Sequence, residues 1–301
     1  MTGPAEKNLF YLKHLLLQKN VDSALIKMEP AANTPIRTNS TTPSRMAEKF
    51  IAPDCFRPYD EVVALQSTRN GGISDGAFCS LNLGRNTEDR EELVHENTRR
   101  LCSAAGINPD RMVTSRQVHG TEILFAKEPG NYDGYDALIT DRKNLFLCIF
   151  TADCYPVLIY DPRHNASGAV HAGWKGSADG IVLKTIEAMR KNFNSCPEEC
   201  RAYIGTGISH EAYEVDREIA LKFPAESRKY SPFMPRNNKY LLDLGIVNYR
   251  QLLASGISPS NIERSPFCSV RDSKLFFSHR RDQGKTGRMI SLIGVTEQKC
   301  T

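Results

Sequence analysis

The stretch LFLCIFTADCYPVLIYDPRHNASGAVHAGWKGSADG, residues 145–180, decides the fold. Its apolar runs at 145–150, 157–160 and 168–171 are short and rich in branched and aromatic residues, which predicts buried strands. Asp153 and Cys154 follow the first run, and His171 ends the third. A sheet built from these strands brings a thiol and an imidazole to strand ends. Groups that do chemistry are usually held there by a rigid scaffold.

Outward from this stretch, the chain alternates irregularly between strand and helix patterns. Periodicity and turn residues predict strands at 61–68, 112–117, 136–140, 201–205, 275–281 and 289–295. They predict helices at 89–105, 178–193, 213–223 and 245–255. An irregular order of this kind is typical of an α+β fold rather than a strict βαβ repeat. We therefore expect a single domain of mixed β-sheets flanked by helices.

The first 48 residues differ from the rest in composition. Leucines at helical spacing in FYLKHLLLQK (10–19) predict one amphipathic helix. Residues 29–44, EPAANTPIRTNSTTPS, have the Pro-, Thr- and Ser-rich composition of a disordered linker. We expect residues 1–48 to form this helix and linker, and residues 49–301 to form the main domain.

Composition and charge restrict the class of protein. The 301 residues carry a net charge of +4 from 39 basic and 35 acidic side chains, and the basic residues are scattered. This argues against a nucleic-acid partner. No apolar run reaches the length of a membrane span. Nine cysteines without a preceding secretory signal indicate reduced thiols in a cytoplasmic protein.

His119, Cys154 and His171 form the most informative set of candidate site residues, because each stands where an apolar strand ends. Two imidazoles and one thiolate suit a catalytic zinc with an open fourth position. The same atoms suit a cysteine hydrolase, with Cys154 as nucleophile, His171 as base and Asp153 or His119 orienting it. A third interpretation has the histidines hydrogen-bonded in the core and Cys154 as a small buried side chain. The residues alone leave these alternatives open.

Eight motifs in order resemble those of the YfiH/YlmD family, whose members are called laccase-domain or polyphenol oxidase proteins and also purine nucleoside phosphorylases. The motifs are STRNGGIS, SLNLG, RQVHG, DALIT, TADCYPVLIYDP, AVHAGWKG, YIGTGISHEAYEV and FFSHRRDQGKTGRM. The resemblance covers roughly residues 60–295. It implies a single α+β domain and a zinc ion held by His119, Cys154 and His171.

The resemblance also implies an activity on small molecules. The family's reaction is phosphorolysis of adenosine, inosine and S-methyl-5′-thioadenosine to free base and (methylthio)ribose 1-phosphate, with adenosine deaminase activity in some members. On this basis Asp153 is expected to move protons, and Arg69 and Arg280 to hold phosphate. Asn82 and His279 are expected to contact sugar or base. The expected partners are a purine nucleoside and phosphate.

Three departures and one older label bear on these expectations. The family usually has Pro at the position of Thr206, often Cys in the segment that reads SHEA at 209–212 here, and Tyr at the position of His279, so substrate choice is expected to differ. A multicopper oxidase needs many imidazoles in His-x-His pairs, and this chain has seven histidines and no such pair. A single copper at the zinc ligands, with polyphenol oxidase activity, is the copper alternative. A further alternative is an interaction protein without catalytic activity.

Overall fold

The computed structural model describes residues 49–223, 234–236 and 239–297. The described residues belong to one compact unit, Ala47–Thr301. The helix and linker predicted at 1–48 lie outside the described residues.

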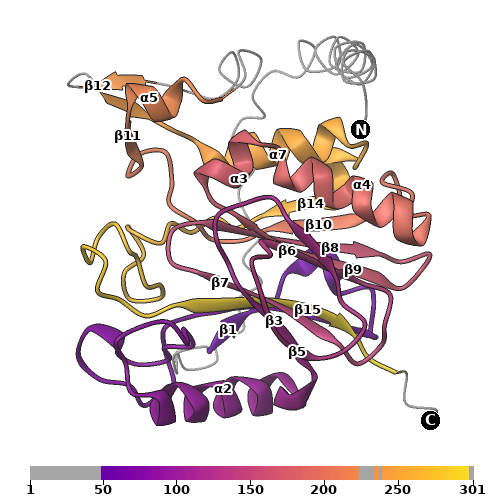
Figure 1. The fold of residues 1–301 in the computed structure, drawn as a ribbon, viewed down its shortest axis with the longest axis horizontal. Helices are drawn as coiled ribbons and strands as arrows, with labels where there is room; N and C mark the ends of the chain where they lie inside the picture. Colours follow the sequence, from indigo (N-terminus) through magenta and orange to yellow (C-terminus); the bar gives the residue numbers. More distant parts are fainter. Residues whose placement is uncertain (1–48, 224–233, 237–238, 298–301) are drawn as a thin grey trace, which may run out of the picture. The chain divides into compact units, whose positions relative to one another are not determined.

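Two six-stranded mixed sheets form the body of the described region (Figure 1). The first has the order β1 (Phe50–Ile51), β2 (Val62–Ser67), β15 (Met289–Val295), β7 (Phe146–Thr151), β3 (Met112–Arg116), β5 (Gly130–Asp133). The second has the order β14 (Ile262–Arg264), β10 (Arg201–Ile204), β8 (Tyr155–Asp161), β9 (Ala166–Ala172), β6 (Ala137–Thr140), β4 (Ile123–Phe125). The strand β15, late in the chain, thus lies inside the first sheet, antiparallel to both β2 and β7.

The two sheets pack face to face over one apolar core. Leu147 and Ile149 of β7 share this cluster with Leu158 and Tyr160 of β8, and all four side chains are fully buried. Strands that are buried on both faces read as continuous apolar runs rather than as an alternating pattern. This explains why the apolar runs between residues 145 and 160 are enough to predict the strands β7 and β8 from the sequence.

Helices cover the outer face of each sheet (Figure 1). On the first sheet, α2 (Glu91–Ala105) buries Leu101 against Cys148 of β7 and its neighbours. On the second sheet, α4 (Ile181–Phe193) buries Met189 in the cluster that contains Val170 of β9. The other helices are α3 (Trp174–Ala178), α5 (Arg217–Ala220) and α7 (Leu244–Ala254), with 3-10 turns at Asp54–Phe56, Gly76–Phe78, Pro109–Arg111 and Pro259–Asn261. The predicted fold class, mixed sheets flanked by helices, is confirmed.

Two predicted elements are wrong. The helix expected at 213–223 is a short strand, β11 (Glu214–Asp216), followed by the single turn α5; β11 pairs with β13 (Lys239–Leu241), which also pairs with β12 (Met234–Arg236). The strand expected at 275–281 is a series of turns. Phe276 and Phe277 are fully buried there, in a small apolar cluster with Met289, without belonging to a strand. The Arg281 guanidinium donates to the backbone carbonyls of Ser269 and Phe276.

The helix predicted at 178–193 is α4, which begins three residues later, at Ile181. Gly180, the residue before it, adopts φ 77°, a left-handed conformation that separates α4 from the short helix α3. The remaining predicted strands and helices are present, with ends shifted by a few residues. No helix in the described ranges is long and apolar enough to cross a membrane.

Candidate active site

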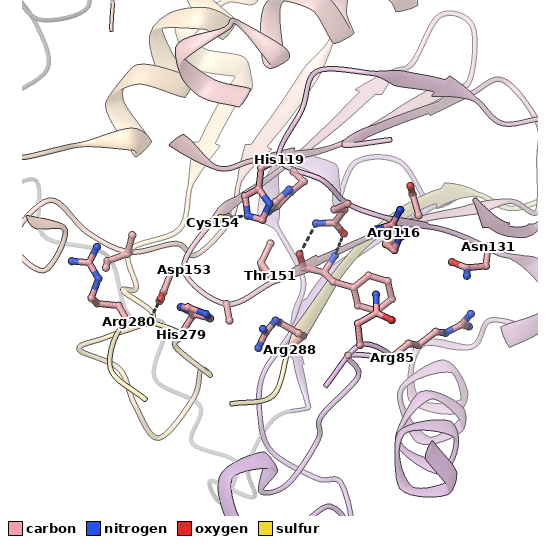
Figure 2. Close-up of a pocket in the computed structure, with 18 of the residues that line it drawn as sticks. Arg85, Arg116, His119, Asn131, Thr151, Asp153, Cys154, His279, Arg280 and Arg288 are labelled. Atoms are coloured by element: carbon pink, nitrogen blue, oxygen red, sulfur yellow. Dashed lines mark hydrogen bonds between the residues drawn. The ribbon is translucent and has the colours of Figure 1, made fainter. Parts of the chain in front are cut away.

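The ends of three strands bring the candidate ligands together. β7 ends at Thr151, and the turn that leads into β8 carries Cys154. His171 lies on β9, opposite Pro156 of β8. His119 follows β3 in a left-handed conformation, with φ 61°. The chain turns sharply after β3, and that turn directs the His119 imidazole toward Cys154 (Figure 2).

The geometry of His119, Cys154 and His171 is that of a three-ligand metal site. One ligand atom of each lies within 4.8 Å of the others. The two imidazole rings meet edge to face, with centroids 4.8 Å apart and an interplanar angle of 76°. Within the described ranges, no other group of three or more His, Cys, Asp or Glu side chains places its ligand atoms this close together.

Asp136 holds two of the three ligands in place. One carboxylate oxygen, Oδ1, accepts hydrogen bonds from His171 Nδ1 at 2.7 Å and from the His119 backbone N–H at 2.9 Å. The other, Oδ2, accepts from the backbone N–H groups of Val118 and Gly120 at 3.1 and 2.7 Å. Because the Nδ1 atom of His171 is hydrogen-bonded to Asp136, its Nε2 atom is the one available to bind a metal ion. A carboxylate behind a histidine in this way is the usual support of a metal-binding imidazole.

The charges of the site stabilise one another. Burial by itself would raise the pKa of the Cys154 thiol, but the imidazoles of His171 and His119 outweigh it and lower this pKa to about 6. Burial by itself would lower the pKa of His171, but Cys154 and Asp136 raise it to about 9. Without a metal, the trio is therefore a thiolate beside an imidazolium. A thiolate is the form of cysteine that binds metals and attacks electrophiles.

The donor set fits zinc. Two imidazole nitrogens and one thiolate sulfur are common zinc ligands, and three protein ligands leave a fourth position for a substrate. A cluster of several copper ions needs more ligands than this trio supplies. The residues present therefore fit a single ion.

A cavity of about 590 Å³ opens over the trio (Figure 2). Phe150, Ile208 and Tyr213 supply its apolar wall. Its polar lining includes Arg85, Arg116, Asp153, His279, Arg280 and Arg288. A cavity with apolar and aromatic side chains, several cations and a candidate metal-ligand cluster suits a small anionic or ring-containing ligand.

Three of the other predicted site residues lie in this cavity. The Asp153 carboxylate accepts hydrogen bonds from Ser269 Oγ and from the Arg280 backbone N–H, both at 2.6 Å. The Arg280 guanidinium lies 5.1 Å from the centroid of the Tyr213 ring and donates to the Glu214 carbonyl at 2.9 Å. His279 also lines the cavity.

The structure places Arg69 and Asn82 outside the cavity lining. The Arg69 guanidinium lies 4.5 Å from the centroid of the Phe277 ring and donates to the carbonyls of Cys79 and Ser273. Asn82 is fully buried, and its Oδ1 accepts from the Arg288 backbone N–H at 2.9 Å. Both residues therefore hold loops together, and their expected roles, holding phosphate and contacting sugar or base, stay predictions.

Sequence reasoning missed Asp136 and Arg288. Asp136 belongs to the motif DALIT and Arg288 to GKTGRM, both of which carry the family resemblance. Nothing local distinguishes either residue from a surface charge. The available signal was that both residues lie in family motifs, although neither is one of the candidate metal ligands.

The fold and the site together define a class of protein: a two-sheet α+β domain with a three-ligand centre at strand ends. The chain belongs to the family described as multi-copper polyphenol oxidoreductase laccase, which matches residues 63–296. It is 38% identical over 233 residues to a purine nucleoside phosphorylase of Deinococcus radiodurans, covering 77% of this chain and 89% of that one. It is 35% identical over 247 residues to the purine nucleoside phosphorylase YfiH of Escherichia coli K12, covering 81% and 98%.

A solved structure shows the same fold. The crystal structure of YlmD from Geobacillus stearothermophilus has a TM-score of 0.78 and 33% sequence identity, covering 84% of this chain and 98% of that one. The predicted resemblance to the YfiH/YlmD family is therefore confirmed.

Proposed function

We propose that this protein is a zinc-dependent purine nucleoside phosphorylase. Its substrates would be adenosine, inosine and S-methyl-5′-thioadenosine, each cleaved by phosphate to the free base and (methylthio)ribose 1-phosphate. Adenosine deaminase activity is part of the proposal as a second reaction. The observation that carries the proposed function is that His119, Cys154 and His171 lie in a cavity that is also lined by cationic and aromatic side chains. The names of the relatives support the same reaction.

His119, Cys154 and His171 would hold the zinc ion. Zinc in such a site acts as a Lewis acid on whatever occupies its open position. Asp136 fixes the direction of the His171 ring, so that the ring does not have to be ordered when the ion binds.

The cavity's own side chains can bind and orient a nucleoside. Phe150 and Tyr213 offer aromatic surface to a purine ring, and Ile208 offers an aliphatic one. Asp153 is held in one orientation by Ser269 and by the Arg280 backbone, which positions its carboxylate to take or return a proton of the substrate. Burial of the base against this wall would also exclude water from the bond that breaks.

The proposal includes a cytoplasmic location without a nucleic-acid partner. All eight cysteines in the described residues are free thiols, as expected in a reducing compartment. The net charge of +4 is small for a protein of 301 residues.

The test is a chromatographic assay of zinc-loaded protein with adenosine, with and without phosphate. Adenine that forms only with phosphate supports phosphorolysis, and inosine that forms without phosphate supports deamination. Both products should be absent with Cys154→Ala, whose folding is checked by thermal melting. The same assay is run with inosine and S-methyl-5′-thioadenosine, and if zinc-loaded protein converts none of the three nucleosides, the proposed function is wrong.

A cysteine hydrolase is the second candidate, because Cys154, His171 and Asp136 stand in the order of a nucleophile, a base and an orienting carboxylate. Asp136, not Asp153, has the orienting contact with His171. Metal removal separates the candidates. A phosphorylase of the proposed kind loses activity on chelation and regains it with zinc, whereas a cysteine hydrolase stays active and is blocked by one equivalent of a thiol reagent.

A further inference from the structure

The Arg288 guanidinium lines the cavity without a carboxylate partner. The residue is half-buried, and its Nη1 donates to the neutral backbone carbonyls of Thr286 and Gly287 at 2.8 and 3.0 Å. Burial lowers the pKa of Arg288 below the usual range for arginine. A partly buried cation without an ion-pair contact is unfavourable. This side chain is therefore suited to an anionic ligand.

Two other arginines nearby, Arg116 and Arg281, have their charge matched by a carboxylate. Arg116 forms an ion pair with Asp133, with Nε 2.6 Å from Oδ1. Arg281 forms a two-point ion pair with Asp282, at 2.8 and 2.9 Å. In the part of the chain that the structure describes, no carboxylate oxygen lies within ion-pair distance of Arg288. Among the described residues, Arg85 and Arg280 also line the cavity without an ion pair, but both are exposed, whereas Arg288 is half-buried. Arg288 is therefore the half-buried arginine of the lining that has no carboxylate within ion-pair distance.

A hydroxyl without a hydrogen-bond partner belongs to a strand residue opposite the neighbour of Arg288. Thr151 lines the cavity and is 1% exposed, and its hydroxyl has no hydrogen-bond partner. Thr151 of β7 pairs in register with Met289 of β15, the residue directly after Arg288. Figure 2 shows Thr151 between His119 and Arg288. A hydroxyl and a guanidinium together are typical donors to a phosphate group.

This pair lies next to the metal-ligand candidates. Thr151 ends the strand from which the Cys154 turn departs. The charges of Asp153 and Cys154 raise the pKa of the Arg288 guanidinium, against the larger effect of burial. Asn82 fixes the Arg288 backbone through its buried amide oxygen. An anion held by this pair would therefore stand beside a ligand that occupies the open metal position.

We propose that Arg288 and Thr151 form the phosphate subsite, an inference that rests on the proposed function. Phosphate bound there as its monoanion would attack C1′ of the ribose. A bond forms between a phosphate oxygen and C1′, and the bond from C1′ to the purine nitrogen breaks. The electron pair of that bond goes to the purine, which takes one proton from the phosphate. The products are the free base and ribose 1-phosphate.

The test compares two changes that remove donors with two that keep them. Arg288→Met and Thr151→Val remove the charge and the hydroxyl, while Arg288→Lys and Thr151→Ser retain them. Arg99→Met, on the exposed surface of α2, is the matched control. Zinc content and thermal melting establish that each variant is folded. Affinity for inorganic phosphate is measured by calorimetry without nucleoside, and KM for phosphate and for adenosine by product formation.

We expect Arg288→Met to raise KM and Kd for phosphate about 100-fold and Thr151→Val about 10-fold, since charged hydrogen bonds exceed neutral ones. KM for adenosine should change by less than about twofold, and the lysine and serine variants should recover part of the loss. If Arg288→Met keeps the wild-type Kd and KM for phosphate, the subsite is wrong and the phosphorylase assignment stands. If wild type binds phosphate through Arg288 but cleaves no nucleoside, the assignment fails and the subsite stands. If wild type neither binds nor uses phosphate, both fail.

Discussion

Asp136 Oδ1 lies 2.7 Å from His171 Nδ1, and both side chains are buried. The same oxygen also accepts from the His119 backbone N–H at 2.9 Å. One carboxylate thus fixes the ring of one candidate metal ligand and the backbone of another. Its hydrogen bonds, His171 first among them, outweigh the effect of burial and hold the pKa of Asp136 below its usual range.

Asp136→Asn should weaken metal binding. The amide retains one acceptor oxygen but loses the charge that orients the His171 ring and the second acceptor for the turn at 118–120. We expect zinc affinity to fall about 10- to 100-fold, which is typical when a carboxylate behind a ligand is removed. Competition with a chelator measures this affinity. Asp141→Asn is the control, because Asp141 directly follows β6 (Ala137–Thr140) as Asp136 directly precedes it. An unchanged zinc affinity in Asp136→Asn would contradict the role given to this carboxylate.

Gly173→Ala should disturb the trio without unfolding the domain. A Cβ at position 173 would stand 3.0 Å from His119 Cδ2 and 3.1 Å from Cys154 Sγ, closer than side chains normally approach. Both ligands would have to move, so we expect a loss of zinc affinity of about tenfold or more, with a small change in melting temperature. Gly120→Ala is the comparison, because its nearest atom would lie at an ordinary 3.5 Å. Equal zinc affinity in the two variants would show that the space around Gly173 does not matter.

The thiol of Cys154 should react unusually fast at low pH once the metal is removed. Its pKa is lowered to about 6, so the thiolate fraction rises through that pH. The rate of alkylation at Cys154, followed by mass spectrometry of its peptide, should therefore have its midpoint near pH 6. The denatured protein should show the ordinary midpoint of about 8.5.

His171→Gln provides the control for the cause of this shift. It removes the neighbouring imidazolium, so the midpoint should move up by about one pH unit or more. A midpoint that stays near 6 in this variant would mean that His171 is not what stabilises the thiolate.

Asp282→Asn should lower stability at neutral pH and have little effect in acid. Burial raises the pKa of Asp282, but hydrogen bonds from Arg281 and Thr286 outweigh it, so the folded pKa lies below the usual range. A carboxyl whose pKa is lower in the folded state adds stability above its unfolded pKa of about 3.9, and this stability is lost as the pH falls through the folded value.

We expect the melting temperature of Asp282→Asn to be lower than that of wild type by about 2–6 °C at neutral pH. The difference should close as the pH falls below about 4. Differential scanning calorimetry across this range measures both curves. A constant difference at every pH would show that the carboxylate charge contributes nothing.

The central strands could be predicted from sequence because their residues are apolar and buried on both faces. The strand β5 (Gly130–Asp133), with sequence GNYD, could not, since it is short, polar and largely exposed. The strand predicted at 275–281 failed for another reason. Apolar residues at 275–277 predict a strand, but they plug a cluster with Met289, and the following arginines serve turns.

The candidate site was predictable to the extent that each residue's chemistry is rare. His119, Cys154 and His171 stand out because few side chains bind metals, and the structure brings them together; that they bind zinc stays a prediction. Arg69 and Arg280 are indistinguishable by sequence, yet only Arg280 lines the cavity. Which arginine faces a cavity depends on loop packing, and periodicity carries no information about it.

The place of β15 between β2 and β7 has a consequence for synthesis of the protein. Residues 62–67 and 146–151 leave the ribosome long before 289–295, yet these two strands meet only through β15. Until then, each presents an open edge to other chains, which favours misassociation. His279, Arg280 and Arg288 arrive in the same late segment. A nascent chain therefore holds all three candidate metal ligands well before it has a complete cavity around them.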